Sequence, residues 1–185
     1  MKRHVALVLL TVTTALVVDL HMDWRRTDNG VLLRVAEHDI DLEGAIRQSW
    51  TRLTRRCGQV EALQAADPAW AASLAALRDY SPPDSRSARL VAMWRQKDWL
   101  IAQAEFDTLM PAIVTLRDHG GRVEIEARGI WSGHTAPWVA APRIRDYLQR
   151  QVPGLPSALT DCLDIAPDSA LQRGPPRPHP SKETP

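Results

Sequence analysis

The N-terminal segment is the feature that most constrains this chain, because it begins like an export signal and continues like a strand. An uncharged run of fourteen residues, Val5 to Val18, follows a positively charged end. A membrane-spanning helix needs about 20 apolar residues, so the run is short for a span and fits a signal-peptide core better. Residues 1–15 are therefore predicted to be a signal peptide, or a signal anchor where no cleavage follows Ala15. The alternative is a buried strand pair in a cytoplasmic protein.

A β-hairpin is predicted directly after this leader. Apolar and polar residues alternate from Val18 to Trp24, and a period of two is typical of a half-buried strand, so the first strand is predicted over Leu16–Arg25. The turn-forming sequence Asp-Asn-Gly follows at 28–30, and a second alternating run occupies 31–37. If the first strand begins near Leu16, a leader that ends at Ala15 and a domain that begins with this hairpin can both be present.

Two helices are predicted next, over the segment 42–79. Asp41 can cap the first helix, which is predicted to run from 42 to 64. Its apolar residues recur at spacings of four and three, as in a coiled coil or a helical hairpin. This stripe is the predicted interaction seam: Ile46, Trp50, Leu53 and Val60. Asp67-Pro68 is a typical start for the second helix, and a proline-rich linker at 81–87 ends this part.

The remaining segment, 88–164, is predicted to be a β-β-α-β-α unit. Two strands are joined at Lys97-Asp98, and Asp107 or Thr108 can cap a helix that ends at Gly120-Gly121. Strands and helices that do not alternate strictly indicate an α+β fold with a small antiparallel sheet. We expect one domain over 16–166 and a disordered, proline-rich tail over 167–185.

The composition narrows the function classes. An apolar fraction of 44% is enough for a core, and a formal net charge of +1 does not favour binding to nucleic acid. The six histidines show no spacing of a local metal site, and there is no P-loop or dinucleotide-binding motif. We therefore expect no metal, no cofactor and no catalytic residue, and we expect contact with a membrane only through the N-terminal segment.

One loop concentrates residues that are typical of binding sites. In "GIWSGHTAPW" the residues Trp131, His134 and Trp138 could line a shallow pocket. Ser132 and His134 lie two residues apart, and no nucleophile-elbow motif surrounds the serine. A strand-to-helix corner packed by its tryptophans is the favoured interpretation, and a ligand-binding or enzymatic loop is the alternative.

The two cysteines, Cys57 and Cys162, both fall on apolar faces of predicted helices. In an exported chain they could form a disulfide, and the alternative is a pair of buried thiols. The sequence leaves both alternatives open.

The segment "WLIAQAEFDTLMPAIVTLRDHGGRVEIEARG", residues 99–129, resembles a known family. It is similar to the periplasmic ferredoxin-like domain of the M-type assembly-platform proteins of type II secretion and of related type IV pilus-assembly proteins. The resemblance implies a strand–helix–strand unit and a non-catalytic scaffold that dimerises or binds sister subunits. The C-terminal "LQRGPPRPHPSKETP" also slightly resembles secretion-monitoring arrest peptides, for which a plain tail is the alternative.

These patterns together predict an exported or inner-membrane-anchored envelope protein that faces the periplasm. Its predicted role is that of a non-catalytic interaction or assembly factor, in a secretion or pilus system if the resemblance holds. The expected partners are envelope proteins, including a second copy of the chain. The rival hypothesis is a small exported enzyme or ligand-binding protein that uses the loop from Trp131 to Trp138.

Overall fold

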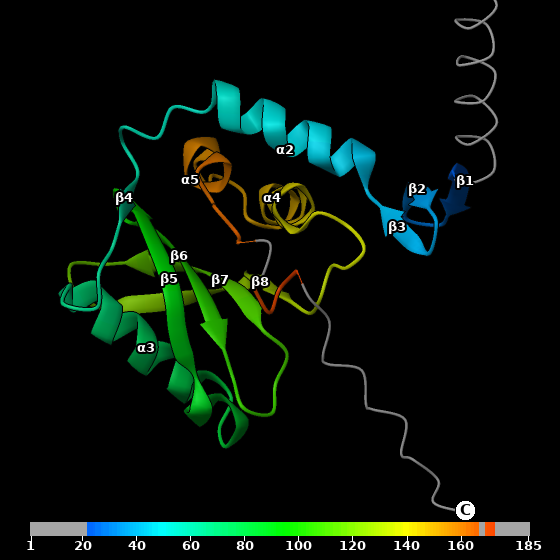
Figure 1. Cartoon of the computed structure of the whole chain (residues 1–185). Coiled ribbons are helices and arrows are strands. Elements are labelled where there is room, and N and C mark those ends of the chain that lie inside the picture. Colours follow the sequence, from blue (N-terminus) through cyan, green and yellow to red (C-terminus); the bar gives the residue numbers. More distant parts are fainter. Residues whose placement is uncertain (1–21, 167–168, 173–185) are drawn as a thin grey trace, which may run out of the picture.

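A computed structural model describes residues 22–166 and 169–172. Two antiparallel sheets and several helices make an α+β fold, as predicted (Figure 1). The chain begins with a three-stranded sheet of β1 (Met22–Thr27), β2 (Gly30–Val35) and β3 (His38–Ile40). The predicted hairpin is therefore present over its described part, with a third short strand added, while its first residues, 16–21, lie outside the described chain.

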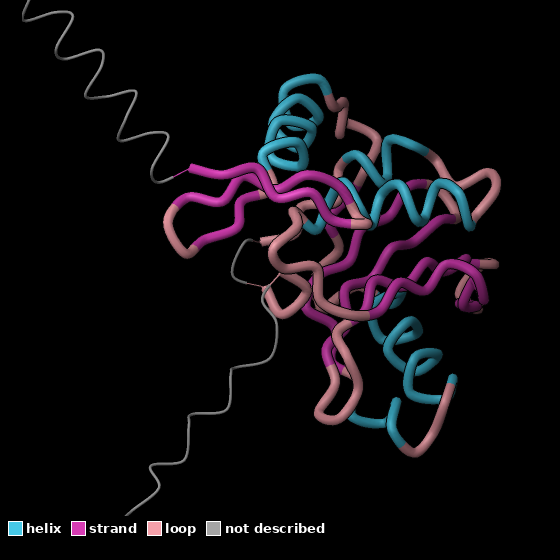
Figure 2. The backbone as a smooth tube through the Cα atoms, turned by 90° about the vertical axis from the view of Figure 1, so that its right-hand side faces the viewer, coloured by secondary structure: helices cyan, strands magenta, loops and turns pink. Residues whose placement is uncertain are grey.

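The larger sheet has five strands in the order β4-β5-β6-β7-β8. Its bounds are β4 (Glu61–Ala62), β5 (Arg89–Gln96), β6 (Trp99–Glu105), β7 (Ala112–Asp118) and β8 (Val123–Ser132). All neighbouring strands are antiparallel, so β5 to β8 form a simple meander in which each strand pairs with the next along the chain. This sheet is the framework of the domain (Figure 2).

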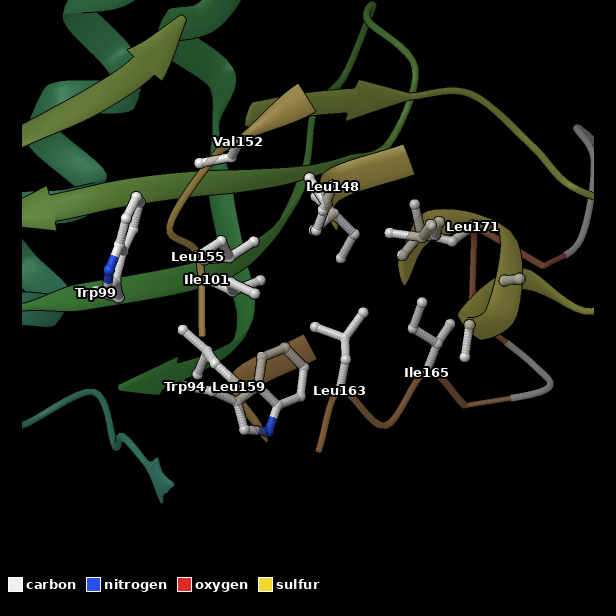
Figure 3. Close-up of a cluster of buried hydrophobic side chains, with 14 residues drawn as sticks. Trp94, Trp99, Ile101, Leu148, Val152, Leu155, Leu159, Leu163, Ile165 and Leu171 are labelled. Atoms are coloured by element: carbon white, nitrogen blue, oxygen red, sulfur yellow. The ribbon is translucent and has the colours of Figure 1, made fainter. Parts of the chain in front are cut away.

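Helices cover both faces of the five-stranded sheet (Figure 1). On one face α3 (Pro68–Tyr80) packs over a core that includes Leu77, Met93 and Leu100. On the other face α4 (Ala140–Gln151) and α5 (Ser157–Asp161) pack over a second core, shown in Figure 3, that includes Leu148, Leu159 and Leu163. The helix α2 (Leu42–Thr54) forms a further layer outside α4.

The predicted β-β-α-β-α order is wrong at its middle element, because residues 112–118 form the strand β7 instead of a helix. The apolar spacing of Leu109, Ile113 and Leu116 suggested a helix, but the consecutive residues Ile113, Val114 and Thr115 are β-branched and stiff in a helix. β7 is covered on both faces, so residues 112–116 are all buried and the strand shows no alternation. A short apolar run of this kind does not distinguish a strand from a helix by its period.

The predicted helical pair is also corrected. α2 ends at Thr54, ten residues earlier than predicted, and the hydroxyls of Thr51 and Thr54 donate to carbonyl oxygens four residues back. The second helix begins at Pro68 as predicted, with the Asp67 carboxylate accepting a hydrogen bond from the Ala69 backbone at 2.8 Å. It packs on the sheet and not on α2, so the two helices do not form a helical hairpin.

Two predicted boundaries change as well. The expected linker 81–87 is part of the packed domain, because it contains the 3-10 helix η1 (Asp84–Ser87) and Ser85 is buried. The expected tail begins later than residue 167, because Leu171 is fully buried and its carbonyl accepts a 2.9 Å hydrogen bond from the Thr135 backbone. The domain therefore extends to at least Gln172.

A close contact between β7 and β8 gives a testable prediction. The pairing shifts register between Val114 and Leu116, and a Cβ added at Gly129 would lie 2.7 Å from the Thr115 Cβ. Gly129→Ala is expected to destabilise the domain by ~1–3 kcal/mol, because two sheet backbones would have to move apart. Urea unfolding measures the change. Gly58→Ala is the matched control, since an added Cβ there meets nothing within 4 Å, and an equal cost for both variants would contradict the prediction.

Candidate functional site

The loop between β8 and α4 brings the three predicted binding residues to one cavity. Trp131, His134 and Trp138 all line a surface cavity of about 590 Å³. Trp131 lies near the end of β8, and Trp138 lies two residues before α4 begins. The other residues that line the cavity come from α4, the loop and the β1–β2 turn: Asn29, Thr135, Ala136, Arg143, Asp146, Tyr147 and Arg150.

His134 has a structural partner in this loop. Its Nδ1 lies 2.7 Å from the carbonyl oxygen of Ala170. Because a carbonyl oxygen can only accept, Nδ1 carries the proton and donates a hydrogen bond to that oxygen. A general base of the triad type is instead oriented by a carboxylate. Within the described residues, no group of three His, Cys, Asp or Glu side chains is placed to hold a metal ion. The hydrogen bond to Ala170 fixes the tautomer of His134 and the orientation of its ring.

Trp138 connects the small sheet to α4. Its ring lies 3.4 Å from where a Cβ on Gly30 would be, and Gly30 has a φ of 132°, which L side chains rarely adopt. The guanidinium of Arg143 stacks on the Trp138 ring, 3.9 Å from the ring centroid. It also donates a 2.8 Å hydrogen bond to the Asn29 carbonyl oxygen. The β1–β2 turn is thereby held at the rim of the cavity.

Asp41 links the two helices that flank this region. One carboxylate oxygen accepts from the Gly44 backbone at 2.8 Å and caps α2, as the sequence predicts. The other accepts from the Val139 backbone at 2.9 Å, at the start of α4. A Cβ on Gly44 would lie 2.1 Å from this carboxylate, so the close approach requires glycine.

The helix α2 is amphipathic in the inverse sense: it buries polar residues and exposes apolar ones. Ile46, Trp50 and Leu53 are 62%, 68% and 81% exposed, whereas Gln48 is only 6% exposed. Surface helices of globular domains normally turn their apolar stripe towards the core. The three residues lie on α2 as the seam prediction requires, but the surface that they form has no partner among the described residues.

Arg145 on α4 accounts for the burial of the polar side of α2. Arg145 is 9% exposed, and its guanidinium donates to the Gln48 side chain at 3.2 Å and to the Thr51 hydroxyl at 3.1 Å. The same group lies 3.1 Å from the Asp161 carboxylate. Burial lowers the pKa of Arg145 below its usual value, and the charge of Asp161 opposes that shift. α2 is thus attached to α4 through hydrogen bonds rather than through an apolar contact.

Ion pairs at the edges of this contact strengthen the attachment. Arg47 of α2 donates two hydrogen bonds to Asp146 of α4, at 2.8 and 2.9 Å, and Arg52 pairs with Asp164 at 2.8 Å. Each of these exposed pairs contributes little to stability. Both arginines of α2 are nevertheless paired with carboxylates of their own domain.

Val60 and Cys57 are not part of the helical seam, because α2 ends before them. Val60 packs at the edge of the core beneath α4. Cys57 forms a disulfide with Cys162, which follows α5, and their Cα atoms are 5.8 Å apart. The bridge connects the chain just after α2 to the helical layer of the domain.

The arginines of the cavity and of the α2 contact were not predicted from the sequence as site residues. Arg143 and Arg150 are separated by seven residues, which places them on one side of an α-helix, so their proximity was open to prediction. The partners of Arg145 on α2, Gln48 and Thr51, are 97 and 94 residues away in the chain. No local pattern in the sequence indicates a contact over that separation.

The remaining predictions concern parts of the chain beyond the described residues. The predicted leader, 1–15, lies outside them, and so does the segment 171–185 that resembles an arrest peptide, apart from its first two residues. Within the described chain, no helix has the length and apolar character needed to cross a bilayer.

The segment that resembles the assembly-platform domain, 99–129, has three consecutive strands in place of strand–helix–strand. The local structure of this segment therefore differs from the strand–helix–strand unit that the resemblance implies. Comparisons with known proteins gave no matching family model and no significant match to a curated protein or a solved structure.

Proposed function

We propose that this chain is an exported or inner-membrane-anchored envelope protein that acts as a non-catalytic interaction or assembly factor. Its binding surface is the α2 seam, defined here as Ile46, Trp50 and Leu53. The exposure of all three side chains on a helix whose polar side is buried is the observation that carries the proposal. Exposed aromatic and aliphatic residues that are grouped in this way are typical of interfaces.

The α2 seam fits a helix of a protein partner. Its residues are spaced by four and three, which allows knobs-into-holes packing against a second amphipathic helix. The flanking arginines Arg47 and Arg52 are already paired within the domain, so apolar contact would dominate the interface. The partner helix belongs to another envelope protein, and a second copy of the chain is the simplest case. A role in a secretion or pilus system would follow from the resemblance alone.

The disulfide supports the proposed location on the periplasmic side. Disulfides persist in oxidising compartments such as the periplasm and are rare in the bacterial cytosol. Cys57 and Cys162 are the only cysteines of the chain, and they are paired. The N-terminal charge and apolar run are independent support, since they have the pattern of an export signal.

A photo-crosslinking amino acid in place of Trp50 tests binding and location together. Expressed in the native host, this variant is expected to form a defined adduct that protease digests in spheroplasts but not in intact cells. Leu53→Glu in the same chain is expected to reduce the adduct at least about tenfold, because a charge would be buried in an apolar interface. The stability of Leu53→Glu alone should change by less than about 0.5 kcal/mol, as for other exposed positions.

The matched control places the crosslinker at Val91, which is 49% exposed on the sheet. An adduct of equal yield from position 91 would show that the seam is not a specific surface. An adduct from position 50 that resists protease in spheroplasts would contradict the periplasmic location while leaving the interface intact. Analytical ultracentrifugation of the purified chain then separates a second copy from a different partner.

The rival function, a small ligand-binding protein, is favoured by one observation, the cavity at the Trp131–Trp138 loop. That cavity and the α2 seam do not share a residue. One molecule could therefore bind a protein partner at the α2 seam and a small ligand in the cavity.

A further inference from the structure

The charges of the Trp131–Trp138 cavity are not balanced within the domain. Two guanidinium groups line it, those of Arg143 and Arg150, and the one carboxylate among its lining residues is Asp146. Asp146 is already held by two hydrogen bonds from Arg47. Among the ion pairs of the described residues, this pair is the one that reaches the cavity. Arg143 donates only to a neutral carbonyl oxygen, that of Asn29. The cavity therefore has an excess of positive charge.

Tryptophan and tyrosine side chains are among the uncharged residues that line the cavity. Trp131, Trp138 and Tyr147 line it, and each offers an apolar ring surface. The Tyr147 hydroxyl donates at 2.9 Å to the Ile130 carbonyl, and Arg143 stacks on Trp138, so these two rings are fixed before any ligand arrives. A volume of about 590 Å³ is within the range of sites for small organic ligands.

From these observations we infer that the cavity binds a ligand that carries both a carboxylate and an aromatic ring. A guanidinium recognises a planar carboxylate by paired hydrogen bonds, and the aromatic walls accommodate the ring. A single negative charge fits better than the double charge of a phosphate, because it matches the excess of one positive charge among the lining residues, two arginines against one aspartate. Arg150 contacts the carboxylate, and Trp131 and Trp138 contact the ring.

Two sources can supply this chemistry: a free aromatic acid, or a peptide whose last residue is aromatic and ends in a free carboxylate. The position of the cavity does not distinguish them, since it opens at the surface between the β1–β2 turn and α4. This inference does not depend on the α2 seam, and its failure would leave the proposed function unaffected.

Isothermal titration of the full, disulfide-bonded chain with matched probes tests the inference. The first pair is 1-naphthaleneacetate and its neutral amide, and the second is the peptide Gly-Gly-Gly-Phe with a free or an amidated C-terminus. We expect at least one acid to bind at least about tenfold more tightly than its amide, because a charge-assisted hydrogen bond is lost in the amide. Preference for the naphthalene acid identifies a free aromatic acid as the ligand class, and preference for the peptide acid identifies a C-terminus.

The variant Arg150→Gln is expected to weaken binding of the preferred acid at least about fivefold and to leave binding of its amide unchanged. Arg150 is exposed, so the substitution should not disturb the fold. Arg56→Gln, an equally exposed arginine after the far end of α2, is the matched control and should change neither affinity. Equal affinities for acid and amide, no binding of either acid up to about 1 mM, or an unchanged acid affinity in Arg150→Gln would each overturn the inference.

Discussion

Replacing Arg145 by alanine is expected to destabilise the domain by ~3–5 kcal/mol and to detach α2 from α4. Removing one member of a buried, hydrogen-bonded charge group leaves its partners unsatisfied, and this is among the costliest kinds of point substitution. The groups left without their donor are the Gln48 side chain, the Thr51 hydroxyl and the Asp161 carboxylate. Urea unfolding measures the free energy, and amide hydrogen exchange along 42–54 measures whether α2 loses its protection.

Two further variants separate charge from packing. Arg145→Met keeps most of the volume and should recover part of the stability, because well-packed apolar residues can replace a buried charge. Arg150→Ala, on the same helix but exposed, should change stability by less than about 0.5 kcal/mol. If Arg145→Ala lowers stability no more than Arg150→Ala does, the hydrogen bonds of Arg145 do not hold α2 in place.

Local signals in the sequence were sufficient to predict many of the helices and strands. Asp67-Pro68 indicated the start of α3, and the Lys97-Asp98 turn indicated the pairing of β5 with β6. Both depend on the conformational preferences of a few neighbouring residues, which a single sequence displays. The loop from Trp131 to Trp138 was also predicted as the connection from a strand to a helix, and its three candidate residues do share one cavity.

The failures have two physical causes. β7 was predicted as a helix because both of its faces are buried, and a strand in that position carries no alternation of polar and apolar residues. The α2 seam was predicted to pack as in a coiled coil or a helical hairpin, and the hairpin is wrong because α3 packs on the sheet instead. In this chain the buried side is polar, and only the distant residue Arg145 explains it. Sequence periodicity gives the apolar side of a helix, but whether that side is buried depends on the tertiary partners.

Three attachments hold α2 on the domain. The helix is capped by Asp41 at its first turn, attached through Arg145 at its middle and followed by the disulfide at Cys57.

Removal of the disulfide has the second large expected effect. The bridge closes a loop of 105 residues, and the chain-entropy model gives ~4–5 kcal/mol for a loop of that size. The double variant Cys57→Ser/Cys162→Ser is expected to lose up to about that amount of stability in urea unfolding. The double variant is preferable to either single one, because a single variant leaves a free thiol that can form mixed disulfides.

Non-reducing electrophoresis of protein taken directly from cells tests whether the bridge forms there. The oxidised chain should migrate faster than the reduced chain, because a link between distant residues makes the denatured chain more compact. Labelling of the unfolded, unreduced protein should find no free thiol. Full labelling of both Cys57 and Cys162 in protein that has reached the native host's envelope would show that the pair stays reduced there, and it would remove the support that the disulfide gives to a periplasmic location. A bridge that forms in the cell but does not stabilise the fold would still support a periplasmic location. In that case only the contacts of Asp41 and Arg145 would stabilise the position of α2.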